Sequence, residues 1–412
     1  MIKNNKFWII ISLINLSIVA LLGMVLRSKF LFSVLPFIEY RNVLSAHSHF
    51  AFAGWVTLSL AVLLINMLPE VKRNNNKYQV ILAGLEITAV GMLLSFPLQG
   101  YGPVSIFFST AFIFFTYFFS GVFISDIIKT DKATAIKILS TGALICLVLS
   151  SAGPFTLAYM LASQSGDAVL YRDSLYGYLH FQYNGFFTLS VFAVFFDQVY
   201  QRLNHSASRS ILQFSVSVLL SIVPALFLSL TWHSDNLFIK FASSVGCLFV
   251  LITIIYFLKV MIELKRTVKF ANVFTRNLWM LAMISFAIKS LLQMGTIVPD
   301  IANAVFGFRP VIIGFLHLVF LGFVTFYILS YWMEKKYFAL ENKFVKSSLV
   351  LFTAAIAANE IVLLIQGIGL MLHVTNPVYP WLLWLISILL FTGAISLALS
   401  VVNSIRKKVS IV

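Results

Sequence analysis

Charged residues are scarce in this 412-residue sequence. Only 10% of the residues are charged and 60% are hydrophobic, whereas a soluble domain carries about 25% charged residues. This composition excludes a soluble globular protein and predicts a polytopic integral membrane protein. We therefore expect an all-α fold, a single transmembrane helical domain over residues 1–412, and direct contact with a lipid bilayer.

Cysteine is nearly absent. Cys146 and Cys247 each lie within an apolar segment, where a thiol behaves as a small buried hydrophobic group. No CxxC or CxxCH motif occurs, which excludes covalent attachment of a c-type haem and argues against a thiolate metal site. Any metal or prosthetic group must therefore be held by other side chains.

Long apolar runs are abundant. One membrane crossing takes about 20 apolar residues, and no soluble domain fits between the runs. The first run resembles a signal peptide, but it is long and no small-residue cleavage site follows it, so we expect it to be retained as a helix. The predicted crossings, about twelve in number, lie near residues 7–26, 42–68, 78–98, 104–128, 136–160, 174–198, 210–232, 238–261, 275–297, 308–333, 346–372 and 378–404.

The basic residues are distributed unevenly between the two ends of these crossings. Of the 29 lysines and arginines, 22 fall on one side, six fall on the other, and Lys289 lies within a predicted helix. The positive-inside rule then places both termini in the cytoplasm, in a bacterial-type inner (plasma) membrane. This bias accounts for the basic isoelectric point near 9.8 without a nucleic-acid partner.

Six of the seven histidines fall in the outer half of the predicted crossings, and only His205 is cytoplasmic. Neutral imidazole is a common ligand of haem iron, copper and non-haem iron. Two histidines two residues apart on a helix point about 200° apart, so His47 and His49 would serve different neighbours. Structural histidines bonded to carbonyl groups are the alternative. The outer histidines are His47, His49, His180, His233, His317 and His373, of which His233 and His373, at helix ends, would more readily face water.

A local pattern repeats at three of these histidines. Each is followed five residues later by glycine and then by a bulky apolar residue, in the sequences HFAFAGW from His49, HFQYNGF from His180 and HLVFLGF from His317. Glycine permits the close approach of a flat macrocycle or of a neighbouring helix. The repeat therefore predicts either a porphyrin site with aromatic walls or tight helix packing.

Other polar groups lie at a similar depth. Lys289 is predicted to be buried in the outer half of its helix, where an ammonium needs a partner such as a haem propionate or a small anion. Arg41 and Arg309, at the outer ends of two helices, would also bind propionates or be ordinary loop charges.

The motifs and their distribution resemble subunit I of the haem-copper oxidases, in the branch of C-type oxidases and nitric oxide reductases. About twelve helices with histidines on the second, sixth, seventh and tenth carry the resemblance. The run from Arg41 to His49 and the stretch from His180 to Gly185 are similar to family segments. The histidine pairs of the family's seventh and tenth helices are single here. The chain also resembles the NnrS-type haem- and copper-containing membrane proteins.

The resemblance implies a haem b, and also copper or non-haem iron. His49 and His317 would be the axial haem ligands. His47, together with His180 and His233, would serve a second metal centre. Electron transfer from a separate donor, a quinol or a cytochrome, would then support an oxidoreductase that binds or reduces nitric oxide or oxygen.

Two other functions remain open from the residues alone. One is a transporter or channel for a metal ion or small anion with a histidine-lined outer vestibule. The other is a non-catalytic membrane factor that carries haem. No inverted repeat of the kind found in many transporters is apparent between the two halves of the sequence.

Overall fold

The computed structural model of the chain describes residues 2–234 and 236–409, and these ranges contain helices, turns and loops but no strand. Eleven helices in this part of the chain are long and apolar enough to cross a membrane. This confirms the prediction of an all-α, multi-pass protein. The eleven are Lys6–Leu31, Tyr40–Met67, Asn76–Gln99, Pro103–Ile128, Thr134–Ala162, His205–Ser229, Leu237–Lys265, Val273–Gly295, Arg309–Glu334, Lys343–Met371 and Val378–Val402.

The segment expected to cross near residues 174–198 is helical from Ala168 to Val199 but is not among these eleven. Its apolar run is interrupted by His180, Gln182 and Asn184, which lower its mean hydropathy. The side chains after the interruption are nearly all buried in the protein. A helix whose surface is covered by other helices does not need the uniform apolarity of one that faces lipid.

Several of these long helices are composed of shorter elements joined end to end. In chain order the elements are α1 (Ile2–Leu31), α2 (Tyr40–Phe50), η1 (Ala51–Thr57), α3 (Leu58–Met67), α4 (Glu70–Arg73), α5 (Asn76–Gln99), α6 (Pro103–Ile128), α7 (Thr134–Ser150), α8 (Ala152–Ala162), α9 (Ala168–His180), η2 (Phe181–Phe187), α10 (Thr188–Val199), η3 (Tyr200–Arg202), α11 (His205–Leu226), η4 (Phe227–Ser229), α12 (Leu237–Thr267), α13 (Val273–Gly295), α14 (Pro299–Gly307), α15 (Arg309–His317), η5 (Leu318–Thr325), α16 (Phe326–Glu334), α17 (Lys343–Met371) and α18 (Val378–Val409).

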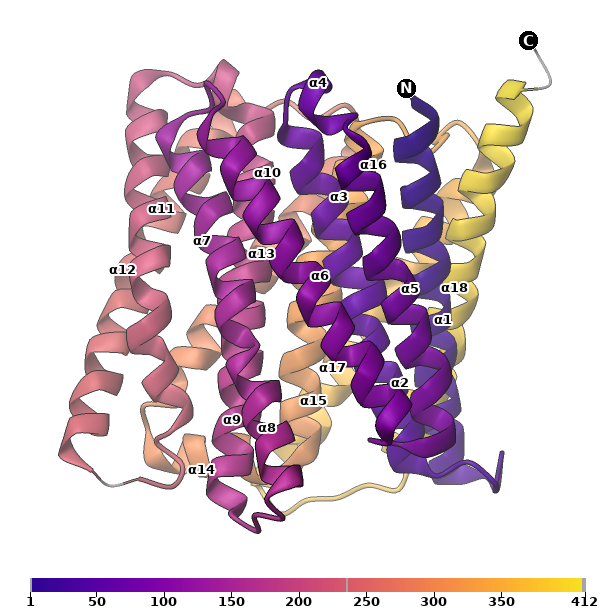
Figure 1. Cartoon of the computed structure of the whole chain (residues 1–412), viewed down its shortest axis with the longest axis vertical. Coiled ribbons are helices and arrows are strands. Elements are labelled where there is room, and N and C mark those ends of the chain that lie inside the picture. The colour runs from indigo at the N-terminus through magenta and orange to yellow at the C-terminus, as the bar shows by residue number, and fades with distance from the viewer. Residues whose placement is uncertain (1, 235, 410–412) are drawn as a thin grey trace.

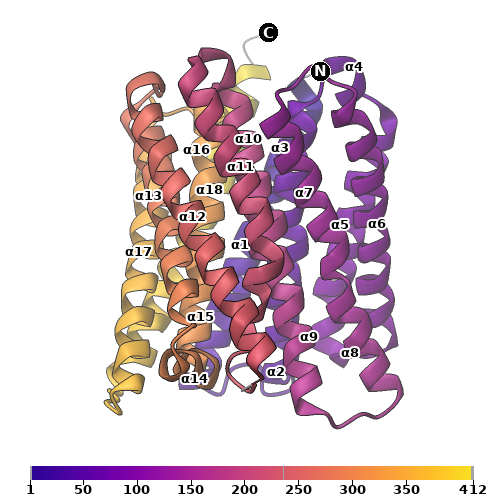
Figure 2. The ribbon, with the colours of Figure 1, turned by 90° about the vertical axis from the view of Figure 1, so that its left-hand side faces the viewer.

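The helices form one bundle with their axes roughly along its long direction (Figures 1 and 2). α1 packs against α18 although they lie at opposite ends of the sequence, and α11 packs along α12. The helices α2, α9 and α15 lie at the end of the bundle opposite to the beginning of α1 (Figure 1). We call this the histidine end, because these three helices contain His47, His49, His180 and His317.

Phenylalanine rings fill the centre of the bundle. The buried ring of Phe192 on α10 lies with its centroid 4.7 Å from that of Phe214 on α11 and 4.8 Å from that of Phe286 on α13. It also lies 6.0 Å from Phe323 on η5. Aromatic contacts of this kind add to the energy of burial itself. The α9–η2–α10 helix is thus held at the centre of the bundle by rings from three neighbouring helices.

Candidate functional site

The structure contains three π-helical segments among its described residues, and each follows a histidine of the repeated pattern. η1 begins two residues after His49, η2 directly after His180 and η5 directly after His317. Under 1% of residues in globular proteins are π-helical, and such turns are frequent at functional sites. The histidine–glycine repeat of the sequence therefore coincides with a repeated distortion of the backbone.

The three distorted helices also recur at a regular interval. They are the second, sixth and tenth long helices of the chain when α9–η2–α10 is counted with the eleven. Each runs from the histidine end toward the opposite end of the bundle (Figure 1). The repeated unit is therefore used three times in the same direction, unlike the inverted repeats of many transporters.

Three histidines share one hydrogen-bonding arrangement. The Nδ1 atom of His47 lies 3.1 Å from the carbonyl oxygen of Val19, that of His49 lies 2.8 Å from Ser45, and that of His317 lies 2.8 Å from Ile313. A carbonyl only accepts, so each Nδ1 is the protonated nitrogen and each Nε2 carries a lone pair. No hydrogen bond to these Nε2 atoms occurs within the described structure. Histidines that ligate metals are oriented in this way by a carbonyl at their other nitrogen.

His47 and His49 point to different neighbours, as their spacing predicts. The ring of His49 packs on Phe96 of α5 at a centroid distance of 4.3 Å and meets the edge of Tyr101 at 5.7 Å. The ring of His47 is hydrogen-bonded to α1 and lies close enough to His317 for positive charges on the two rings to repel each other. Of the two histidines on α2, His47 is therefore the one that lies near His317.

Two arginines lie near each other, one close to the end of α1 and one at the start of α15. Arg309 donates a hydrogen bond of 3.2 Å to the hydroxyl of Tyr40, and its guanidinium lies 5.4 Å from the centre of that ring. Arg27, near the end of α1, lies close enough to Arg309, His47 and His317 for its positive charge to repel a positive charge on each of them. Sequence reasoning counted Arg27 only as an outer basic residue. Its position in the last turn of the first apolar helix was the available signal.

Arg41 does not join this group. It is exposed at the start of α2 and interacts electrostatically with Tyr101, beside His49. Lys289 also lies elsewhere, because it is buried on α13 and interacts with His180. The basic side chains considered as partners of haem propionates are therefore spread over three places, and Arg309 is the one that lies near Arg27.

His180 is buried and both of its ring nitrogens are engaged. Nε2 donates to the carbonyl oxygen of Ile222 on α11 at 2.7 Å, and Nδ1 accepts from the amide of Asn184 at 3.1 Å. A metal would have to break one of these bonds to reach the ring. In this conformation His180 anchors the start of η2 to α11.

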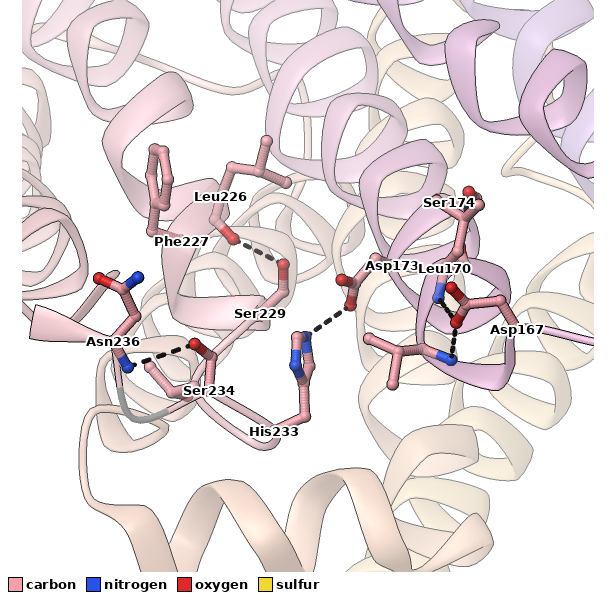
Figure 3. Close-up of polar contacts among 12 residues, drawn as sticks. Asp167, Leu170, Asp173, Ser174, Leu226, Phe227, Ser229, His233, Ser234 and Asn236 are labelled. Carbon is pink, nitrogen blue, oxygen red and sulfur yellow. Dashed lines mark hydrogen bonds and ion pairs between the residues drawn. The ribbon is translucent and has the colours of Figure 1, made fainter. Parts of the chain in front are cut away.

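His233 lies in the turn between η4 and α12, where its Nε2 atom lies 3.0 Å from the Oδ1 atom of Asp173 on α9 (Figure 3). His373 lies in the turn after α17, is exposed and has a φ of 59°. Within residues 2–234 and 236–409, no three side chains of histidine, cysteine, aspartate or glutamate are grouped to hold a metal. His47, His180 and His233 are therefore not assembled into one metal site.

The glycines of the repeat lie against protein side chains. A β-carbon added at Gly54 would lie 2.6 Å from the ring of Phe50, one added at Gly185 would collide with Cys146, and one added at Gly322 would lie 2.8 Å from Ser285. Of the two interpretations of the repeat, this geometry corresponds to tight packing.

Polar side chains connect the π-helical segments to each other and to α1. The Nε1 atom of buried Trp55 in η1 donates to the hydroxyl of Thr325 in η5 at 2.9 Å. Asn15 of α1 donates to the carbonyl oxygen of Gly54 and to a carboxylate oxygen of Glu86, each at 2.8 Å. The bond from Asn15 gives the buried backbone carbonyl of Gly54, within the π-helical segment, a donor. Sequence periodicity gives no signal for them, since the partners are far apart in the chain.

Replacing Thr325 by valine is expected to lower the free energy of unfolding by about 1–3 kcal/mol, because it leaves the buried Trp55 N–H without an acceptor at almost unchanged volume. Unfolding in mixed detergent micelles measures the change. Thr392→Val is the matched control, since its hydroxyl bonds only to carbonyls of its own helix. Equal stability of the two variants would contradict a structural role for the Trp55–Thr325 bond.

Comparison with known proteins adds no assignment: no protein-family model matches the sequence, and no curated protein is significantly similar to it.

Proposed function

We propose that the chain is a haem-binding integral membrane protein, resembling subunit I of the haem-copper oxidases, that binds or reduces a diatomic gas, nitric oxide or oxygen. The observation that carries this proposal is the shared geometry of His47, His49 and His317. Each ring is held through Nδ1 by a carbonyl and keeps its Nε2 lone pair free. Imidazoles prepared in this way are typical axial ligands of haem iron.

The surroundings of His317 fit such a group. The helix α15, which ends at His317, has no buried residue, whereas most residues of the following η5 are buried. The half-buried apolar side chains of α15 provide a surface that a macrocycle between α15 and α2 would cover. His317 would be one axial ligand and His47 the other, with His49 the alternative that the sequence suggested.

The charges near this pair also suit haem. Arg27 lies close enough to His47 and His317 for its charge to act on both rings, and Arg309, about two turns before His317 at the start of α15, lies near Arg27. Arginine pairs well with carboxylates such as propionates. When bound, a haem b would supply the redox-active iron. The protein would hold its ligands, neutralise its propionates and exclude water from it.

The proposed placement in the membrane follows from charge. We place twelve crossings in a bacterial-type plasma membrane by counting Ala168–Val199 as one of them, with both termini in the cytoplasm and the histidine end outward. A separate quinol or cytochrome would deliver electrons. A second metal, copper or non-haem iron, is suggested only by the resemblance. The described residues form no group of three ligands that would support it.

A non-catalytic haem-handling factor would use the same histidines, so it is the nearest competing function. A metal-ion transporter is less well supported, because the repeated helices run in one direction and the part of the chain that the structure describes forms no three-ligand group.

The proposal is tested on protein purified from a haem-competent host by an optical spectrum and metal analysis. We expect a Soret band, iron in stoichiometric amount and a shift of the reduced spectrum on adding nitric oxide. Preparations without absorbance or iron would overturn the proposal. A bound haem with no turnover of nitric oxide or oxygen would favour the haem-handling factor.

A further inference from the structure

A small cavity with several polar side chains in its lining lies beside η2, and neither His47 nor His317 lines it. It is formed by residues of η2, α10, α11, α12 and α13, and its volume is about 20 Å³. A cavity needs about 10–15 Å³ to hold one water-sized particle. The space therefore suits a single small species.

The cavity contains a buried ammonium group. Lys289 is 3% exposed, and among the described residues its Nζ atom takes part in no hydrogen bond or ion pair. Its nearest recorded partner is the ring of Phe286, with the centroid 5.5 Å from Nζ. A lone charge in an apolar interior is costly unless it is paired. The described structure supplies no carboxylate for this pairing.

The other polar groups of the cavity include donors. Asn184 uses one amide N–H for His180 and retains a second, and the amide of Gln293 also lines the cavity. The hydroxyls of Ser221 and Thr253 donate to carbonyls of their own helices, at 2.8 and 2.9 Å, and each can rotate toward a stronger acceptor. A positive charge surrounded by N–H and O–H groups is the environment of an anion.

We propose that Lys289 and Asn184 bind a monovalent, halide-sized inorganic anion in this cavity. Its charge compensates the ammonium, which a water molecule cannot do. Its contacts extend from Lys289 on α13 to Asn184 in η2, so binding ties α13 to the π-helical segment that follows His180. The proposed anion site does not involve haem, so a test of this site does not depend on whether the proposed function is correct.

Thermal unfolding of the full-length protein in detergent tests this site. Sodium chloride or sodium bromide is titrated against sodium gluconate at constant ionic strength. Because a ligand of the folded state raises the unfolding temperature, we expect a saturable rise of about 3 °C. The Lys289→Gln variant should lose this rise, and Lys346→Gln, which changes an exposed lysine, should keep it.

A second measurement does not depend on the variant. Crystals grown in bromide should show an anomalous peak beside the Nζ of Lys289 and the amide of Asn184. The proposal is overturned if the wild type shows no halide-specific stabilisation, if Lys289→Gln responds like the wild type, or if bromide occupies other positions only.

Discussion

Replacing His317 by alanine is expected to reduce the haem content of the purified protein by at least about tenfold. Even the loss of a group that orients a ligand typically costs 10–100-fold in affinity, and this change removes the ligand itself. His317 is held through Nδ1 by its own helix, so the truncation leaves the backbone contacts of α15 in place. The ratio of Soret absorbance to protein, with a pyridine haemochrome assay, measures the effect.

The matched control is His233→Ala. His233 pairs with Asp173 in a turn, and its removal should leave the haem content unchanged. Comparing His47→Ala with His49→Ala then identifies the second axial ligand, for which its proximity to His317 favours His47. A His317→Ala protein that retains a full complement of haem would refute the assignment.

Deleting both Ala51 and Phe52, the first two residues of η1, is expected to abolish haem binding while leaving the helix content nearly unchanged. A π-turn closes its hydrogen bond over one residue more than an α-turn, so loss of the first residue lets the segment form a regular α-helix with its two ends nearly in phase. Loss of the second residue then turns the part of the helix before the deletion by about 100° relative to the part after it. His47 would move away from His317, whose position depends on α15 and not on α2.

Ala51→Ser is the control, because it keeps the number of residues and hence the π-turn. Circular dichroism and gel filtration establish that the deletion variant is folded. Haem bound at wild-type levels in the folded deletion variant would show that η1 does not set the direction of His47.

The sequence predicted the transmembrane helices and the histidine end well, because both depend on local composition. The repeat at His49, His180 and His317 was recognisable in the sequence. The sequence did not show whether its glycines face a cofactor or a side chain, or that each histidine precedes a π-helical segment. Whether a glycine faces a macrocycle or a side chain such as that of Cys146 depends on the neighbouring helix. A π-turn likewise depends on the hydrogen-bond register, which hydropathy does not report.

Contacts between residues on different helices could also not be predicted from the sequence. The spacing of His47 and His49 predicted that they diverge, and it left open which of them approaches His317. The bond from Trp55 to Thr325 joins residues 270 positions apart. Arg27 carries the same charge as any loop arginine, and only the packing of α1 against α2 and η1 brings it near the histidines.

An electron cryomicroscopy map of the protein purified from a haem-competent host tests the central claim most directly. The account predicts a macrocycle between α2 and α15, with iron joined to the Nε2 atoms of His317 and of a histidine on α2. A map in which these Nε2 atoms instead donate hydrogen bonds to protein or water, with no macrocycle between the two helices, would contradict it.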